Sequence, residues 1–425
     1  MKQFQFLSAG VFVIILFFSC HRGNSISIIN DNDKLYINYN GEVRFNNEEN
    51  AILAISRNGF IRYIHNEKKL RAENGANGEI KYEMEDDGRK ISPESAEGKR
   101  FLEDVVKDMI DMGFDAKGRM ERLYNKGGAS ALLNEVQHLK MDYIKNMYLE
   151  YLLSVDSISQ DQIKSVARKI STEISSDYDK GRLLQKFPVE YLRDSLTARA
   201  WFESVKGINA DYEKSNTLVN MARQDISKAQ INQIVDVVNS MQSDYEKSNV
   251  LKELIFKRTF AEENFDRTLD AISYVNADYE KVNLLKALIE KEKPSADHFN
   301  KLLDVTEHVN SDFDKANLIK EMIETGLPAG ASFDKLLSAV VHTNSEFDRT
   351  NLLKDVIMKN ISSQDQWISV INATASIESD YDKSNFLVTI APDLPKTDSV
   401  KMAYLKVART ISQESDLGRA VKAME

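Results

Sequence analysis

Cysteine is almost absent from this chain, since Cys20 is the only one among 425 residues. An internal disulfide is therefore excluded. The sequence also lacks the motifs HExxH, GxSxG and GxxxxGK[ST], a cysteine pair and a glycine-rich phosphate loop. These absences favour an interaction protein over an enzyme, and we expect neither a metal nor another cofactor. An enzyme without a recognised motif remains an alternative.

An excess of positive charge is also missing. The chain has 56 Lys and Arg against 66 Asp and Glu, which gives a net charge of −10. A nucleic acid or an anionic membrane surface is therefore an unfavourable partner. Acidic and basic residues are interspersed rather than grouped in blocks, which is typical of a solvated exterior.

Only one long apolar run is present, at the N-terminus. Lys2 is followed by an apolar run from Phe4 to Phe18, broken only by Gln5, Ser8 and Gly10, and then by Ser19 and Cys20. This order is typical of a signal peptide, and the run is shorter than the roughly 20 residues of a membrane span. It resembles a bacterial lipoprotein signal, with the cysteine as the residue that receives the lipid. We expect a signal peptide at residues 1–19, a lipidated tether at residues 20–25, and a membrane-anchored protein on the periplasmic face or the cell surface.

Residues 26–92 predict a small antiparallel β meander. Apolar and polar residues alternate in short segments, and these are separated by Asn40-Gly41, Asn58-Gly59, Asn77-Gly78 and Asp87-Gly88. Such pairs supply the positive φ angles of tight hairpins. Residues 93–126 then predict bridging helices, the first of which starts at Pro93 and ends at Gly113.

A repeat occupies residues 127–425. Its core acid returns every 33 or 34 residues, at Asp177, Asp211, Asp244, Asp278, Asp312, Glu346 and Asp380, with weaker copies at Asp142 and Asp416. A period of this length predicts an α-α solenoid, here of about eight or nine helical hairpins, so the fold class is mainly α. We expect the two weaker copies at the ends of the stack, where capping repeats need a more polar outer face.

Each repeat predicts a helix A, a tight turn and a helix B. In helix A the apolar residues lie thirteen, nine, six and three places before the core acid, as in Phe265, Leu269, Ile272 and Val275. This is the spacing of one helical face. In helix B an aromatic residue follows the acid, and we expect that ring to pack in the core. Phe313 and Phe347 replace tyrosine there, so the hydroxyl group is dispensable.

The turn before helix B has the pattern of a capping box. A serine precedes the acid, and a second acid follows three residues after the serine, as in Ser243-Asp244-Tyr245-Glu246. Where Ala210 or Ala277 replaces the serine, we expect Asp211 or Asp278 to act as the cap or as the partner of the helix dipole. This need for one cap in each repeat explains the acids better than a row of catalytic carboxylates does.

An asparagine recurs five places after the acid, although asparagine is a poor helix former. One hypothesis is a structural ladder that bonds each helix B to the turn of the adjacent repeat. The other is a groove in which the amides bind the main chain of an extended peptide, as similar asparagines do in armadillo repeats. We favour the ladder. The six positions are Asn216, Asn249, Asn283, Asn317, Asn351 and Asn385.

Four further residues invite a functional interpretation. Trp201 and Trp367 lie on helix A stripes, so we expect them in the core. His308 and His342 occupy the same place in consecutive repeats. Packed helices are about 8–10 Å apart, which is too far for both rings to bind one metal ion. We therefore expect both histidines at the surface or at its border.

The repeat core, of the type Ser-Asp-Tyr-Glu-Lys-x-Asn-x-Leu, resembles that of bacterial extracytoplasmic lipoproteins with helical repeats. The resemblance extends to Gly41–Phe45, Ser56–Phe60 and Gly127–Glu135. Similar repeat regions occur beside BlaR-type sensor metallopeptidases. The likeness covers about residues 41–425, but the zinc-binding helix of the peptidase has no counterpart. It therefore implies an extracytoplasmic repeat protein and no proteolytic residue.

We expect a lipid-anchored envelope scaffold or sensor accessory that binds another protein or peptide through its helical-repeat surface. The first alternative is a receptor for a cell-wall or glycan fragment. An acidic concave face with few exposed rings would favour a protein partner, whereas a row of exposed Tyr and Trp would favour a glycan.

Overall fold

The computed structural model describes residues 18–20, 23–30, 33–257, 262–291 and 295–425. The chain divides into two compact units, Met1–Trp201 and Phe202–Glu425. Residues 1–17 of the predicted signal peptide lie outside the described residues. The predicted fold class is confirmed: an antiparallel β region precedes helices that pack in successive pairs.

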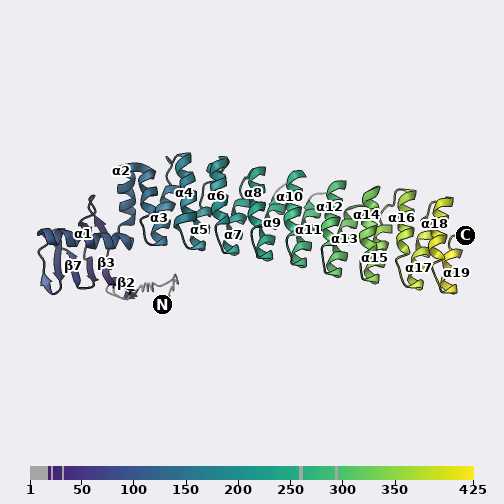
Figure 1. Ribbon diagram of the computed structural model, residues 1–425, viewed down its shortest axis with the longest axis horizontal. Coiled ribbons are helices and arrows are strands. Elements are labelled where there is room, and N and C mark those ends of the chain that lie inside the picture. The colour runs from purple at the N-terminus through teal and green to yellow at the C-terminus, as the bar shows by residue number, and fades with distance from the viewer. Residues whose placement is uncertain (1–17, 21–22, 31–32, 258–261, 292–294) are drawn as a thin grey trace. The chain divides into compact units, whose positions relative to one another are not determined.

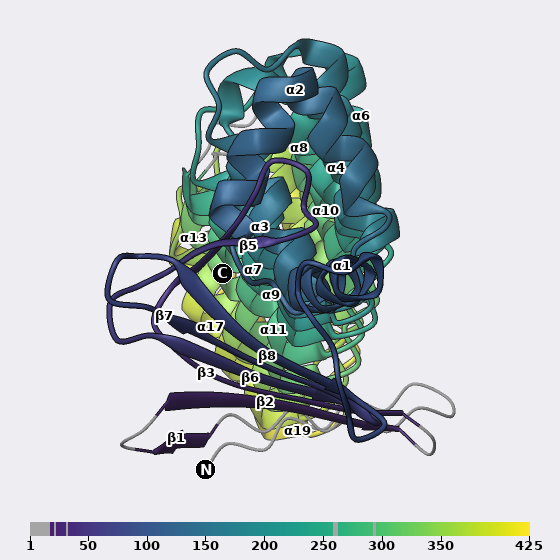
Figure 2. The same ribbon diagram turned by 90° about the vertical axis from the view of Figure 1, so that its left-hand side faces the viewer.

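One antiparallel sheet dominates the start of the N-terminal unit. Its strand order is β1-β2-β3-β6-β7-β8-β9, and consecutive neighbours form hairpins except where β3 pairs with β6. Figure 2 shows β2, β3, β6, β7 and β8 side by side. The strands are β1 Phe18–Cys20, β2 Gly23–Asn30, β3 Asp33–Asn40, β6 Phe60–His65, β7 Lys68–Asn74, β8 Ile80–Asp86 and β9 Arg89–Lys90.

A separate hairpin interrupts the predicted meander. Strands β4 Val43–Phe45 and β5 Ile52–Ile55 pair only with each other and lie between β3 and β6 in the chain. Gly41 and Asn58 flank this insertion with φ angles of 84° and 63°. Their left-handed conformations, which glycine and asparagine tolerate best, turn the chain out of the large sheet and back into it.

Helix α1, Ala96–Asp111, supplies the other side of the sheet's core. Ser95 caps it by accepting a hydrogen bond from the backbone of Gly98, so the helix begins three residues after the predicted Pro93. Its buried face, which includes Phe101, packs in one cluster with inward residues of the sheet such as Ile37. Gly113, with φ of 85°, ends the segment as predicted.

The N-terminal unit continues with its own helical pairs. Helix α2 contains non-helical backbone at Gly127 and Gly128, the pair expected to begin the repeats. The remaining elements include a short 3₁₀ helix, η1, and the helix α6, which crosses the boundary between the two units. The bounds are α2 Ala116–Val136, α3 Asp142–Leu153, α4 Gln160–Glu173, α5 Asp177–Gln185, η1 Val189–Arg193 and α6 Ser195–Lys206.

The C-terminal unit is a two-layer array of helices (Figure 1). Each A helix packs against the next A helix, and each B helix against the next B helix. The A helices are α8 Lys228–Val238, α10 Glu262–Ser273, α12 Ala296–Glu307, α14 Ala331–Val341, α16 Gln364–Thr374 and α18 Asp398–Ala408. The B helices are α7 Asp211–Ala222, α9 Asp244–Lys257, α11 Asp278–Lys291, α13 Asp312–Thr325, α15 Glu346–Ile357, α17 Asp380–Ile390 and α19 Glu414–Lys422.

The predicted apolar stripes form the core between these layers. Phe265, Leu269 and Ile272 of α10 are buried, and so are the corresponding residues of α12. In α11 the buried set includes Leu285 and Leu288, seven and ten places after the core acid. Each helix therefore buries its stripe only because neighbouring repeats cover it, as expected for a solenoid.

Candidate functional site

The core acid of a B helix binds the turn of the following repeat. The Oδ2 atom of Asp278 accepts hydrogen bonds from the backbone N–H groups of Asn310 at 3.0 Å and Ser311 at 2.9 Å. The same pair of bonds joins Asp211 to Gln242 and Ser243, Asp244 to Asn276 and Ala277, Glu346 to Glu378 and Ser379, and Asp380 to Ser412 and Gln413.

The serine before the acid caps its own helix, as predicted, but the predicted capping box is not completed, because the second acid does not bond back to the serine N–H group. Ser311 accepts a hydrogen bond from the backbone of Asp314, and its own N–H group is bound by Asp278 of the preceding repeat. At Ala210 no side chain caps helix α7. The expectation that Asp211 replaces the serine as a hydrogen-bonding cap is therefore wrong. The Asp211 carboxylate binds the turn of the next repeat instead. Asp211 still lies in the first turn of α7, where the helix dipole favours an acid.

A basic residue three places after the acid binds the same turn from its other side. Lys247 donates to the backbone oxygen of Tyr274 at 3.3 Å, and Lys281 donates to that of His308 at 3.4 Å. Arg349 donates to the oxygen of Ser376 in the same way. These oxygens lie at the carboxyl ends of A helices, where a cation is favourable. Acid and base together form what we call the clamp: they bind N–H and C=O groups that the tight turn leaves open.

The aromatic residue beside the clamp acid is exposed, so the prediction that the ring packs in the core is wrong. In the C-terminal unit these side chains retain 60–76% of their accessible surface. The position lies on the opposite side of the B helix from the buried stripe, and the fold gains little from an aromatic residue there. We call this set the ring row: Tyr212, Tyr245, Tyr279, Phe313, Phe347 and Tyr381. Tyr143 and Tyr178 are the equivalent exposed residues of the N-terminal unit.

The recurring asparagines lie half-buried, one helical turn beyond the rings. Asn385 accepts a hydrogen bond from Arg419 of the next repeat at 3.0 Å, and Asn249 approaches Glu246 of its own helix at 3.5 Å. Among the described residues, the side chains of the other four have no hydrogen-bond partner. The turn groups that a ladder would bind are held by the clamp instead. We call the six the amide row: Asn216, Asn249, Asn283, Asn317, Asn351 and Asn385.

A lysine follows three places after the asparagine in four consecutive B helices. Lys252 forms an ion pair with Glu280 at 3.2 Å. Lys286, Lys320 and Lys354 form no ion pair with any residue that the structure describes. We call these four residues the lysine row.

The three rows share one face of α9, α11, α13 and α15, and the ring and the amide share that face on α7 and α17. Ring, amide and lysine are spaced four and then three residues apart, as in Tyr279, Asn283 and Lys286. Residues at such spacings stand one above the other on a helix. Because successive B helices pack side by side, each row continues from helix to helix across the C-terminal unit. We call the surface made by α7, α9, α11, α13, α15 and α17 the ring-amide face.

The tryptophans and histidines have structural positions. Trp201 is 1% exposed and its indole N–H donates to the backbone oxygen of Leu184 at 3.0 Å, which confirms it as a core residue. Trp367 is only half-buried, so the expectation that it lies in the core is wrong. His308 and His342 are exposed at the ends of their A helices, as expected. In the described part of the chain, no three His, Cys, Asp or Glu side chains are placed to share a metal ion.

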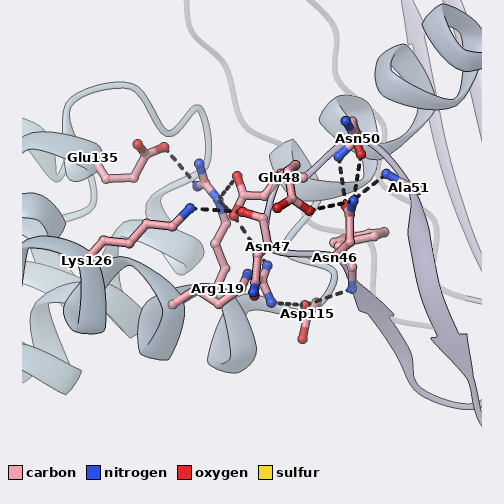
Figure 3. Close-up of polar contacts among 12 residues, drawn as sticks. Asn46, Asn47, Glu48, Asn50, Ala51, Asp115, Arg119, Lys126 and Glu135 are labelled. Atoms are coloured by element: carbon pink, nitrogen blue, oxygen red, sulfur yellow. Dashed lines mark hydrogen bonds and ion pairs between the residues drawn. The ribbon is translucent and has the colours of Figure 1, made fainter.

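A second polar cluster lies in the N-terminal unit, where the loop of the β4–β5 hairpin meets α2 (Figure 3). Arg119 binds Glu49 at 2.9 Å and Glu135 at 2.8 Å, and Arg122 binds Asp115 at 2.7 Å. Burial lowers the pKa of Arg119, but Tyr148, Glu49 and Glu135 together raise it above the ordinary value. The cluster joins the inserted hairpin to the helices, and its charged groups pair with one another.

Cys20, the predicted lipidation site, is the last residue of β1, where its backbone pairs with Gly23. None of the described helices is both long enough and apolar enough to span a membrane. No protein-family model matches the chain, and no curated protein is significantly similar to it.

Proposed function

We propose that this chain is a lipid-anchored protein of the bacterial cell envelope that binds another polypeptide along the ring-amide face, as a scaffold or as the accessory of a sensor. The ring row and the amide row together carry the proposal, because exposed rings alone would suit a glycan as well. An aromatic residue occupies the same exposed position in every B helix from α7 to α17. Exposed rings add little to the fold, whereas tyrosine and phenylalanine are typical of binding surfaces.

The amide row favours a polypeptide as the ligand. An asparagine amide donates and accepts, so it suits the C=O and N–H groups of a peptide main chain. The clamp already binds the turn groups of the fold, and four of the six amides are not bonded to another described residue. Each repeat therefore offers one ring for a side chain and one amide for the main chain.

A glycan fragment is the second candidate, because a row of exposed rings also suits the faces of sugars. The ring row supports this alternative directly. Two points favour the polypeptide. The two tryptophans are not part of the row, and phenylalanine at two positions lacks the hydroxyl group that would bond to a sugar.

A photocrosslinking amino acid at the position of Phe313, in cells that carry the full chain, tests the polypeptide function. Mass spectrometry should identify a crosslinked protein at this position. The same group at Met402, an exposed residue of helix α18, is the matched control. Crosslinks that contain only glycan, or crosslinks that are equal at both positions, would contradict the proposal.

The anchor is supported by the sequence alone. Cleavage before Cys20 would remove Phe18 and Ser19 from β1, and the large sheet would then start with β2. We expect Cys20→Ala to move the protein from the detergent phase into the soluble fraction. Unchanged partition, with no acylated peptide that starts at residue 20, would refute the anchor without affecting the binding face.

A further inference from the structure

The spacing of the ring row restricts the conformation of a polypeptide that follows it. Packed helices are about 8–10 Å apart, and the rings repeat once per B helix. A polyproline II helix has three residues per turn and rises about 3.1 Å per residue, so its side chains return to one face every 9 Å or so. A β-strand returns to one face every two residues, after roughly 6.7 Å, and falls out of register with the rings.

The amide row separates polyproline II from an α-helical ligand. Two turns of α-helix span about 11 Å, which is only slightly longer than the ring spacing. An α-helix, however, satisfies its own backbone groups, and amides such as Asn283 and Asn317 would gain nothing from it. A polyproline II segment has no internal hydrogen bonds, so its main chain is free to bond with an amide at each turn.

The lysine row indicates the charge of the ligand. Lys286 and Lys320 are not paired within the described chain, and they lie on the same face as the amides. The exposed acids Glu290 and Glu324 lie one helical turn beyond these two lysines, at the far end of the face. The acids Glu321 and Asp355 are half-buried at its edge. A ligand with an acidic side chain toward the lysines is therefore complementary in charge.

We propose that the ring-amide face binds an acidic, proline-rich segment in the polyproline II conformation. Every third residue, a proline or another apolar residue, lies against the ring row. The main chain bonds to the amide row, and acidic side chains face the lysine row. All three rows are present on α9, α11, α13 and α15, which accommodates four turns of ligand, or about 12 residues. Aromatic surfaces bind the polyproline II conformation well because a segment that already adopts it loses little conformational entropy on binding. The inference rests on the polypeptide function proposed above.

Fluorescence anisotropy with the full chain and labelled 12-residue peptides tests this proposal. The probe is (Pro-Pro-Glu)₄. One control is (Gly-Ser-Glu)₄, which keeps the charge without the conformation, and another is (Pro-Pro-Lys)₄, which reverses the charge. We expect (Pro-Pro-Glu)₄ to bind at least tenfold more tightly than either control and to lose affinity as salt is added. Equal binding of the acidic peptides, or no binding of (Pro-Pro-Glu)₄, would overturn the proposal.

Variants then locate the binding surface. Tyr279→Ala with Phe313→Ala, Asn283→Ala with Asn317→Ala, and Lys286→Gln with Lys320→Gln should each weaken binding at least fivefold. Met402→Ala is the control and should leave it unchanged. Weakening by Met402→Ala alone would place the ligand elsewhere and refute the proposal.

The two proposals fail in different ways. A protein crosslinked at the position of Phe313, together with no binding of (Pro-Pro-Glu)₄, would refute the polyproline II ligand and leave the polypeptide function standing. A chitin oligosaccharide that binds at the rings, when no peptide does, would refute both.

Discussion

Asp278 and Ser311 are 33 residues apart in the chain, yet the carboxylate of Asp278 lies 2.9 Å from the backbone nitrogen of Ser311. Ser311 in turn caps helix α13, so one acid holds the residue that starts the next B helix. With Lys281 on the C=O side of the same turn, the clamp assigns a structural role to the acid and the base of the repeat core. It leaves the ring and the asparagine without such a role, except in α17, where Arg419 of the next repeat contacts both Tyr381 and Asn385.

Removing the base of one clamp should lower stability. Lys281→Met keeps the aliphatic stem but withdraws the charge from the end of α12, which we expect to cost about 1 kcal/mol. The melting temperature should then fall by about 2–4 °C. Lys286→Met, on the same helix but without a contact to a helix end, is the control and should melt like the native chain. Equal melting of both variants would show that Lys281 does not act through the turn.

The N-terminal unit depends on Arg119. Its side chain is 10% exposed between Glu49 and Glu135. Arg119→Met leaves both carboxylates without their main partner and should cost about 3 kcal/mol. Hydrogen exchange at the amide of Phe45, which donates to Asp115 in this cluster, should accelerate.

Two further variants control that measurement. Adding Glu135→Gln to Arg119→Met removes one unpaired charge and should recover part of the loss. Arg100→Met changes an exposed arginine of helix α1 and should have no effect. If Arg100→Met accelerated exchange as much as Arg119→Met, the cluster would not be what holds the hairpin.

Deletion of Asp278–Ser311 should leave a folded, shorter array. The new junction joins Ala277 to Asp312, so Asp244 still bonds to Asn276 and Ala277, and Asp312 replaces Asp278 at the start of a B helix. Stability in a solenoid comes from each repeat and its neighbours. Circular dichroism should show a helical protein that melts cooperatively. Deletion of helix α11 alone, Asp278–Lys291, removes half of a repeat and brings two A helices together in sequence, so this variant should unfold. Loss of structure in both would contradict the repeat account.

Alkaline pH should destabilise the end of the array through Tyr404. Burial raises the pKa of its phenol from 10.0 to about 12. The folded chain therefore holds this proton more tightly than the unfolded chain. The resulting stability is complete below pH 10 and is lost as the pH rises from 10 to 12. Ultraviolet titration of the native chain and of Tyr404→Phe should differ by one tyrosine that ionises near pH 12. A difference near pH 10 would show that the phenol is not buried.

The sequence predicted the architecture because both helical stripes recur in successive repeats and because Asn-Gly and Asp-Gly pairs mark the turns of the β region. It did not predict the clamp. A carboxylate at a helix start has the same pattern whether it binds its own helix or a turn that comes 32 residues later, as Asp244 does. The sequence also did not predict the exposure of Tyr279, because a large ring in an amphipathic helix usually lies in the core. The helical spacing places Tyr279 on the opposite side of α11 from Leu285 and Leu288, and this spacing indicates an exposed ring.

The most direct test of the account compares two adjacent residues, Asp278 and Tyr279. Asp278→Ala leaves two turn N–H groups without an acceptor and should cost about 1–3 kcal/mol, which lowers the melting temperature by several degrees. Tyr279→Ala removes a ring that the fold does not bury, so its melting temperature should equal that of the native chain. If Tyr279→Ala melts as early as Asp278→Ala, the ring belongs to the fold, and the ring-amide face is not a binding surface.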